Sequence, residues 1–260
     1  MNKYKYIEIV ISDSVVNIVF SRIEKRNALN QEMITEIQSV LNTYKNNPNI
    51  RVILLSSASN VFCAGADLKY LNNIQNYTYD QHLNDSITLM NLFKTMLSYP
   101  KLIISKVIGP AIAGGCGIAT ASDFIFCTNE SSFGYPEVKI GFMPALVSTF
   151  LKYKIKHSDV TRLLLTGDII QAKEAHKIGL VAYIDKVEEI DNHISEFIYT
   201  HIKNTSSTSI AYTKKLQFEL NNLENKLNIA AQFNAKIRLN TDFKKGIQSF
   251  LNKISINWTK

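Results

Sequence analysis

The chain has 260 residues, of which 46% are hydrophobic and 20% charged, a composition typical of a globular protein with an ample core. It contains no apolar run of about eighteen residues, so the sequence predicts no transmembrane helix. The N-terminal residues lead directly into an alternating strand pattern instead of a signal peptide, and we therefore expect a cytoplasmic protein.

The formal net charge of +7 raises the question of a nucleic-acid partner. The lysines are spread along the chain, however, and their clusters are short, as at Lys244-Lys245. A basic, solvated surface accounts for this distribution. We expect neither a nucleic-acid partner nor a membrane partner.

The three cysteines have neither the spacing of a metal site nor the number that a disulfide framework needs. Cys63 and Cys116 stand within glycine-rich segments, but no histidine is near either of them in sequence. Small apolar packing residues are therefore favoured over nucleophiles at both positions. We expect no metal ion and no redox cofactor.

The first half of the chain alternates strand and helix patterns. Residues 4–11 and 15–20 alternate around Ser12-Asp13-Ser14 and predict a β-hairpin. Asn30 predicts the N-cap of a helix that ends before residues 46–48. The other elements predicted here are strands at residues 52–55, 102–108 and 124–127, helices at 85–97 and 115–121, and a mobile loop at 72–79.

Helical patterns dominate from residue 160 onward. The predicted helices cover residues 160–165, 172–178, 190–203, 210–223, 229–238 and 242–254, with one further strand at 181–184. This change in pattern predicts a β/α core over residues 1–195 and a C-terminal helical region over 196–260. Because no low-complexity linker separates the two, we expect the helical region to dock on the core.

Three glycine-flanked segments carry the chemistry. Residues 62–68 (Phe-Cys-Ala-Gly-Ala-Asp-Leu) and 112–117 (Ile-Ala-Gly-Gly-Cys-Gly) supply small residues and bare N–H groups. Residues 133–138 place one carboxylate, Glu137, in a turn bracketed by glycine and proline. Two N–H donors that converge on one oxygen beside a carboxylate can stabilise an enolate and move a proton next to a carbonyl.

These segments belong to an ordered series of motifs. The series runs Arg22-x-x-Lys25-Arg26-Asn27-Ala28-Leu29-Asn30, residues 62–68, Gly114-Gly115-Cys116, Phe133-Gly134-x-Pro136-Glu137-x-x-x-Gly141, Leu165-Thr166-Gly167, Ala175-x-x-x-Gly179-Leu180-Val181 and Thr241-Asp242-Phe243-Lys244-Lys245-Gly246. In order and spacing it closely resembles the enoyl-CoA hydratase/isomerase (crotonase) superfamily, over nearly the whole chain.

The resemblance implies an α/β fold, a crotonase-like spiral of ββα repeats with a C-terminal helical region. That region would serve in trimerisation and cover the active site. The resemblance also implies a homotrimer or a hexamer formed as a dimer of trimers. The substrate would be an acyl-CoA thioester, so that coenzyme A enters with the substrate and no separate cofactor is needed.

At matching positions, the resemblance implies that the N–H groups of Ala66 and Gly114 form an oxyanion hole and that Glu137 moves the proton. Small residues suit this role because bulky side chains would obstruct an oxygen about 3 Å from both donors. The apolar surroundings of Glu137 predict a raised pKa. Substrate-binding and coenzyme A-binding roles are implied for Lys25, Arg26, Ala28, Ala64, Asp67, Leu68, Gly115, Gly117 and, from a neighbouring subunit, Lys253.

The chain departs from the family pattern at one position. Hydratases of this family usually carry two glutamates, and Gly117 stands where one of them is expected. Substitute acids could come from Asp80, His82 or Asp85, although surface positions are favoured for all three. Tyr135 could orient Glu137 or could equally be a packed aromatic residue.

The predicted function is hydration of a 2-enoyl-CoA thioester through a stabilised enolate and a single glutamate. Residues 113–120 and 134–142 also resemble bacterial methylglutaconyl-CoA hydratases, which favours a hydratase with a branched substrate of that type. One alternative is a Δ3,Δ2-enoyl-CoA isomerase, because one base can carry a proton between two carbons. Another is a non-catalytic member of the fold that binds coenzyme A or RNA.

Overall fold

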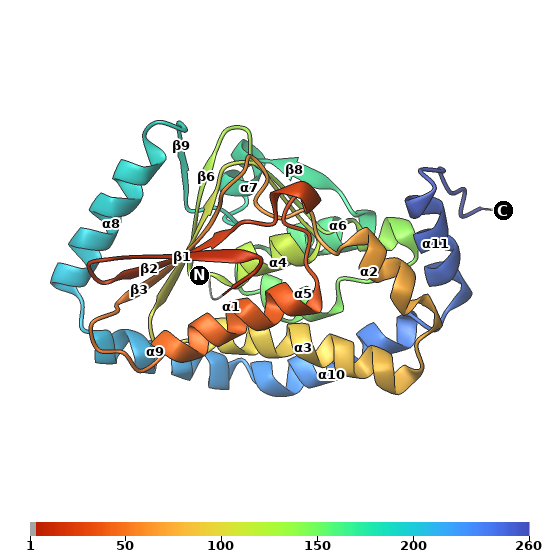
Figure 1. Ribbon diagram of the computed structural model, residues 1–260, viewed down its shortest axis with the longest axis horizontal. Helices are drawn as coiled ribbons and strands as arrows, with labels where there is room; N and C mark the ends of the chain where they lie inside the picture. The colour runs from red at the N-terminus through yellow and green to blue at the C-terminus, as the bar shows by residue number, and fades with distance from the viewer. Residues whose placement is uncertain (1–3, 260) are drawn as a thin grey trace.

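The computed structural model describes residues 4–259 and contains a six-stranded sheet and a three-stranded sheet (Figure 1). The larger sheet has the order β1-β2-β3-β4-β6-β9. Its strands are β1 (Ile7–Ser12), β2 (Val15–Phe20), β3 (Val52–Ser57), β4 (Leu102–Val107), β6 (Phe124–Thr128) and β9 (Tyr183–Asp185). β1 and β2 form the predicted antiparallel hairpin, and the other neighbours are parallel.

The smaller sheet consists of β5 (Pro110–Ile112), β7 (Ser132–Gly134) and β8 (Ile169–Gln171), in that order. The sequence predicted none of these strands, and the expectation of a single strand after residue 160 is wrong. Each strand has only three residues. A segment this short cannot show the alternation by which a strand is recognised.

Helices surround both sheets. They are α1 (Gln31–Tyr44), α2 (Leu68–Asn73), α3 (Tyr79–Leu97), α4 (Gly114–Ala121), α5 (Ala145–Leu151), α6 (His157–Thr166), α7 (Ala172–Lys177), α8 (Ile190–Asn204), α9 (Ser207–Leu220), α10 (Leu223–Ile237) and α11 (Thr241–Leu251). Short 3-10 helices cover Ile23–Lys25, Ile74–Asn76 and Pro136–Ile140. None of the helices within residues 4–259 is long and apolar enough to cross a membrane.

The six-stranded sheet is covered on both faces. On one face, Ile194 and Phe197 of α8 pack against Phe126 of β6. The larger core on the other face includes buried residues of α1, α3 and α4, among them Met33 and Phe93. In Figure 1, α8 stands apart from α1, α3 and α10, which run together along the lower part of the molecule.

The predicted mobile loop at residues 72–79 is wrong. The chain there forms the end of α2, the 3-10 helix Ile74–Asn76 and the start of α3. Thr78 begins α3 with a capping box, since Thr78 and Gln81 each bind the other's backbone. Buried Ile74 also packs with Phe243 of α11. Tertiary packing and a local cap thus override the polarity of this stretch.

The C-terminal part of the chain is helical, as predicted, and α10 lies along α3 (Figure 1). The predicted boundary between residues 195 and 196 lies inside α8, whose apolar residues pack on the sheet. Division of the chain into a core and a trimerising helical region stays a prediction.

The N-cap of α1 gives a direct test of the local sequence reasoning. The Asn30 side chain accepts a hydrogen bond of 2.9 Å from the Met33 N–H, as the sequence predicts. We expect Asn30→Ala to lower the free energy of unfolding by about 1 kcal/mol, because that N–H loses its partner. Urea denaturation measures the change. Asn30→Ser is the matched control and should retain most of the stability; equal losses in both variants would contradict the assignment.

Candidate active site

One large cavity, of about 730 Å³, brings the three glycine-flanked segments together. Its lining includes Ala64 and Ala66 from the first segment, Gly114 from the second and Glu137 from the third. The cavity is also lined by residues of α3 and α10. It is large enough for a substrate of the size of a drug-like ligand.

Main-chain hydrogen bonds hold the first two segments side by side. The N–H groups of Phe62 and Cys63 donate to the carbonyl oxygen of Pro110, at 3.1 and 3.2 Å. The Ile112 N–H donates to the Cys63 carbonyl oxygen at 2.9 Å. This pairing works like a short parallel ladder, so the relative position of the two segments does not depend on flexible side chains.

Two residues with positive φ stand where the segments meet, and only the second, which has a Cβ, is strained. Gly65 has a φ of +94° and Ala113 a φ of +51°. A Cβ on Gly65 would lie only 3.1 Å from the Cβ of Ala113. The Ala113 N–H donates to the Gly134 carbonyl oxygen at 2.8 Å, which ties the third segment to the second. Positive φ at a non-glycine residue costs free energy and is often retained at a functional site.

Ala66 and Gly114, the residues that follow Gly65 and Ala113, each have a free N–H group. Gly114 is the first residue of α4, where an N–H has no partner within the helix. The Ala66 N–H makes no hydrogen bond to any residue from 4 to 259, although Leu29 pairs with the residues on both sides of it. Both positions line the cavity. An oxyanion hole requires two such main-chain donors, and the role of Ala66 and Gly114 as that pair stays a prediction.

Glu137 is one of the carboxyl groups that line the cavity, with Glu24, Asp67 and Asp85. It lies in the 3-10 helix Pro136–Ile140 and is only 8% exposed. Its Oε2 atom has no hydrogen-bond partner among the described residues. Burial raises the pKa of Glu137 to about 7, which agrees with the shift predicted from its apolar neighbours. A carboxyl group with this pKa can both accept and donate a proton near neutral pH.

Tyr135 and the cysteines are packing groups. The Tyr135 hydroxyl lies 2.6 Å from Oγ1 of Thr120 and is buried away from the cavity lining. The sequence left two roles open for Tyr135, and this contact agrees with that of a packed aromatic residue. Burial raises the pKa of the Cys63 and Cys116 thiols to about 12, so neither is a thiolate near neutral pH.

Several predicted binding residues do line the cavity. They are Lys25, Arg26, Ala28, Ala64 and Asp67. Asp67 also has a structural role that the sequence did not reveal. It caps α2 by accepting from the Tyr70 N–H and forms a buried ion pair of 2.6 Å with Arg22. Arg22 in turn donates to the Ala28 carbonyl oxygen at 2.7 Å and so braces this side of the cavity.

Other predicted binding residues lie elsewhere. Gly115 and Gly117 are buried within α4 and do not line the cavity. A Cβ on Gly115 would lie 2.5 Å from the Cβ of Cys63, so its small size serves packing. The side chain of Leu68 lies outside the described part of the chain. Lys253 is exposed beyond α11 and does not line the cavity, and its contact with a neighbouring subunit stays a prediction.

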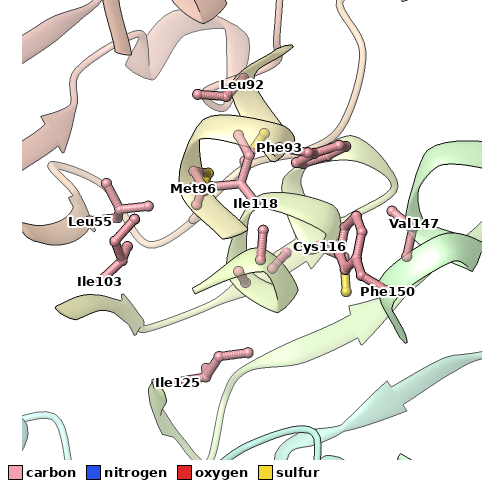
Figure 2. Packing of buried hydrophobic residues seen from close by; sticks show 14 of the residues in the cluster. Leu55, Leu92, Phe93, Met96, Ile103, Cys116, Ile118, Ile125, Val147 and Phe150 are labelled. Atoms are coloured by element: carbon pink, nitrogen blue, oxygen red, sulfur yellow. The ribbon is translucent and has the colours of Figure 1, made fainter. Parts of the chain in front are cut away.

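The position of the missing second glutamate is filled by the core. A Cβ on Gly117 would lie 2.8 Å from Phe93 Cζ and 2.9 Å from Val147 Cγ2. Figure 2 shows Phe93 and Val147 beside the helix that carries Cys116 and Ile118. A glutamate at residue 117 would therefore need Phe93 and Val147 to shift before its carboxyl group could act as a second acid.

Except for Asp85, which was named as a possible substitute acid, the sequence also missed a polar cluster in the cavity wall. Asp85 and Ser86 of α3 and Asn234 of α10 line the cavity together with Arg238, the residue that ends α10. The expectation that His82 and Asp85 lie on the surface is wrong, because His82 packs with Phe243 of α11 and Asp85 pairs with Arg238. Asp80, by contrast, is exposed. Asn234 and Arg238 are four residues apart in the helix predicted at 229–238, and this spacing is the signal that could have revealed the cluster.

Comparison with known proteins agrees with this geometry. The sequence profile of the enoyl-CoA hydratase/isomerase family matches residues 10–260. A Thermus thermophilus protein named provisionally as an enoyl-CoA hydratase is 36% identical over 235 residues, which are 88% of this chain and 91% of that protein.

The chain belongs to the enoyl-CoA hydratase/isomerase family. Crotonyl-CoA hydratase of Syntrophomonas wolfei is another relative, 25% identical over 98% of each chain. The solved structure of a Bacillus halodurans enoyl-CoA hydratase superposes with a TM-score of 0.87 at 23% identity, over 94% of this chain and 100% of that one. A methylmalonyl-CoA decarboxylase superposes with a TM-score of 0.85 at 24% identity, over 98% of each chain. These structures confirm the predicted crotonase-like fold.

The crowding around residue 117 predicts the effect of adding a side chain there. We expect Gly117→Glu to lower the free energy of unfolding by about 1–3 kcal/mol through overpacking against Phe93 and Val147. Chemical denaturation measures the loss, and Gly117→Ala, which adds only the crowded Cβ, should lose less stability than Gly117→Glu. A fully stable Gly117→Glu enzyme with faster hydration would contradict the packing described above.

Burial of Glu137 predicts that stability depends on pH. The folded pKa of about 7 lies above the ordinary value of 4.5, so the folded state binds the proton more tightly. Stability should be greatest below pH 4.5 and should fall as the pH rises through 7, by about 3 kcal/mol in total from this group. Glu137→Gln should therefore unfold at higher temperature than the wild type at pH 8.5, but not at pH 4.5. A constant difference between the two proteins across pH would contradict this account.

Proposed function

We propose that the protein hydrates a 2-enoyl-CoA thioester, with Glu137 as the only carboxylate that carries protons. The observation that supports this most strongly is the combination of one buried carboxyl group of pKa about 7 with two free N–H donors in the same cavity. The relatives named as enoyl-CoA hydratases support the same reaction class.

Hydration then proceeds in two proton transfers through one residue. The carboxylate of Glu137 accepts a proton from water while the water oxygen attacks C3 of the enoyl group. The electron pair of the double bond moves onto the thioester oxygen, where the N–H groups of Ala66 and Gly114 stabilise the enolate. Protonated Glu137 next delivers the same proton to C2, so that the product is a 3-hydroxyacyl-CoA. Loss of one such donor typically costs a hundred- to a thousandfold in rate, so the main-chain pair would be the principal catalytic device.

Isomerisation of a 3-enoyl-CoA to a 2-enoyl-CoA is the second candidate. The observation that favours it is the filled space at Gly117, which leaves Glu137 without a second acid from α4. In this reaction Glu137 takes a proton from C2 to give a dienolate and returns it to C4, with the same oxyanion stabilisation.

Absorbance of the conjugated enoyl thioester separates the two candidates. Crotonyl-CoA loses this absorbance on hydration, whereas a 3-enoyl-CoA gains it on isomerisation. Turnover of crotonyl-CoA alone supports the hydratase, and turnover of the 3-enoyl-CoA alone supports the isomerase. No turnover of either thioester would support a non-catalytic member of the fold.

The nucleotide part of the substrate and the assembly state belong to the proposal as well. Lys25 and Arg26 on the cavity lining would contact the phosphates of coenzyme A.

Association into trimers, or pairs of trimers, is supported by large exposed apolar side chains on α9 and α10, including Tyr212, Leu220 and Phe233. We propose a cytoplasmic enzyme with no metal ion and no cofactor besides the coenzyme A of its substrate.

Replacement of Glu137 tests the mechanism directly. We expect Glu137→Gln to lower kcat by about a hundred- to ten-thousandfold, because the other buried carboxyl groups of the cavity lining, Asp67 and Asp85, are held in ion pairs with arginines. Binding of a saturated acyl-CoA, measured by titration calorimetry, should remain. In the wild type, kcat/KM for hydration should rise with pH through about 7, since the ionised carboxylate is the base in the free enzyme. Retained turnover in Glu137→Gln would refute the assignment.

A further inference from the structure

A buried ion pair forms part of the cavity wall outside the proton-transfer machinery. Arg238, at the end of α10, donates from Nη1 to Oδ2 of Asp85 on α3. The two side chains are only 10% and 9% exposed. Both residues line the same cavity as Glu137.

Stability does not explain this pair. A buried ion pair loses most of its Coulomb gain to desolvation, and a well-packed apolar pair of similar volume would often be as stable. The surrounding cavity wall is otherwise rich in apolar side chains, such as Leu89, Phe142 and Met143. Polar groups placed in such a wall usually orient a bound ligand.

The ion pair leaves Arg238 with unused donors. A guanidinium group has five N–H donors and no acceptor, and the described residues provide a hydrogen-bond partner for Nη1. Its Nε atom is buried without a partner among the described residues. The guanidinium also lies over the ring of Phe142, with 5.1 Å between Cζ and the ring centroid, which fixes its plane.

Neighbouring residues hold this corner in place. Gln31 donates to Oδ1 of Asp85 at 3.1 Å, so both oxygens of that carboxylate are engaged. Ser86 Oγ lies 3.0 Å from Asn234 Oδ1 and links α3 to α10. Burial, with the positive charges of Arg238 and Lys244, lowers the pKa of His82 to about 4, so His82 adds no charge near neutral pH.

We propose that this cluster, Asp85, Ser86, Asn234 and Arg238, binds a carboxylate on the acyl group, so that the substrate is the coenzyme A monothioester of an unsaturated dicarboxylic acid. The proposal rests on the proposed function, because it takes the cavity to be an acyl-CoA site. A carboxylate is the acyl substituent that suits these groups best, because it only accepts hydrogen bonds and pairs with arginine in a fixed plane. Asp85 then holds Arg238 in position and keeps its charge balanced while the cavity is open.

The test compares two thioesters of similar length, glutaconyl-CoA with a terminal carboxylate and 2-pentenoyl-CoA without one. We expect wild-type kcat/KM to be higher for glutaconyl-CoA. The variant Asp85→Asn/Arg238→Gln removes both charges at once and leaves no unpaired ion in the wall. It should lower the ratio of the two kcat/KM values by about ten- to a hundredfold, which is the range for a hydrogen bond to a charged group.

A second ion pair between the same helices provides the matched control. Lys94 of α3 pairs with Glu224 of α10 and neither residue lines the cavity. The variant Lys94→Gln/Glu224→Gln should leave the ratio of kcat/KM values as in the wild type. An equal fall in the ratio for this control would show that the α3–α10 contact matters only for structure and would overturn the proposal.

Binding of unreactive analogues separates this proposal from the proposed function. Glutaryl-CoA should bind the wild type more tightly than valeryl-CoA does in titration calorimetry, even if neither enoyl thioester is turned over. Such a result would keep the carboxylate site while the hydratase assignment fails. Equal affinities for the two analogues would overturn the proposal, as would an equal loss of affinity for free coenzyme A in the Asp85→Asn/Arg238→Gln variant, which would place Arg238 on the nucleotide.

Discussion

The main-chain pairing between residues 62–63 and 110–112 is the constraint on which the site depends. It forces Gly65 and Ala113 into contact, and the N–H groups that follow them then remain unpaired toward the cavity. The third segment joins through the bond from Ala113 to Gly134, three residues before Glu137. Backbone hydrogen bonds, rather than side-chain contacts, therefore set the relation between the electrophilic and the basic groups. Such preorganised donors need little reorganisation as charge develops on an oxygen.

The rest of the molecule supplies the base and the wall of the cavity. The six-stranded sheet and α8 form a rigid base, while α3 and α10 add the wall that shapes the cavity. Burial that excludes water from Glu137 raises its pKa and at the same time costs stability near neutral pH. The free energy that the core provides elsewhere allows the fold to hold this one carboxyl group in an apolar place.

Local patterns predicted much of the fold and the reactive part of the site. The hairpin, the capped helix after Asn30 and the buried strands followed from alternation and capping. The glycine-flanked segments and Glu137 stood out as residue patterns, whereas the choice of Ala66 and Gly114 came from the resemblance to the family. The three-residue strands were missed because they have no measurable period. Residues 72–79 were misread because their order depends on α11, more than a hundred residues away. Asp85 was named only as a possible substitute acid, and its pairing with Arg238 was missed for the same reason, since it joins two distant helices.

The aromatic ring of Phe93 limits which residues can replace Gly117 on α4. Since Phe93 and Val147 occupy the volume that any side chain at residue 117 would need, substitutions at these sites cannot be independent. A carboxylate on this helix would fit with less displacement of the core if Phe93 or Val147 were smaller. Phe93, together with Val147, therefore limits which acid or base groups this helix can bring into the cavity.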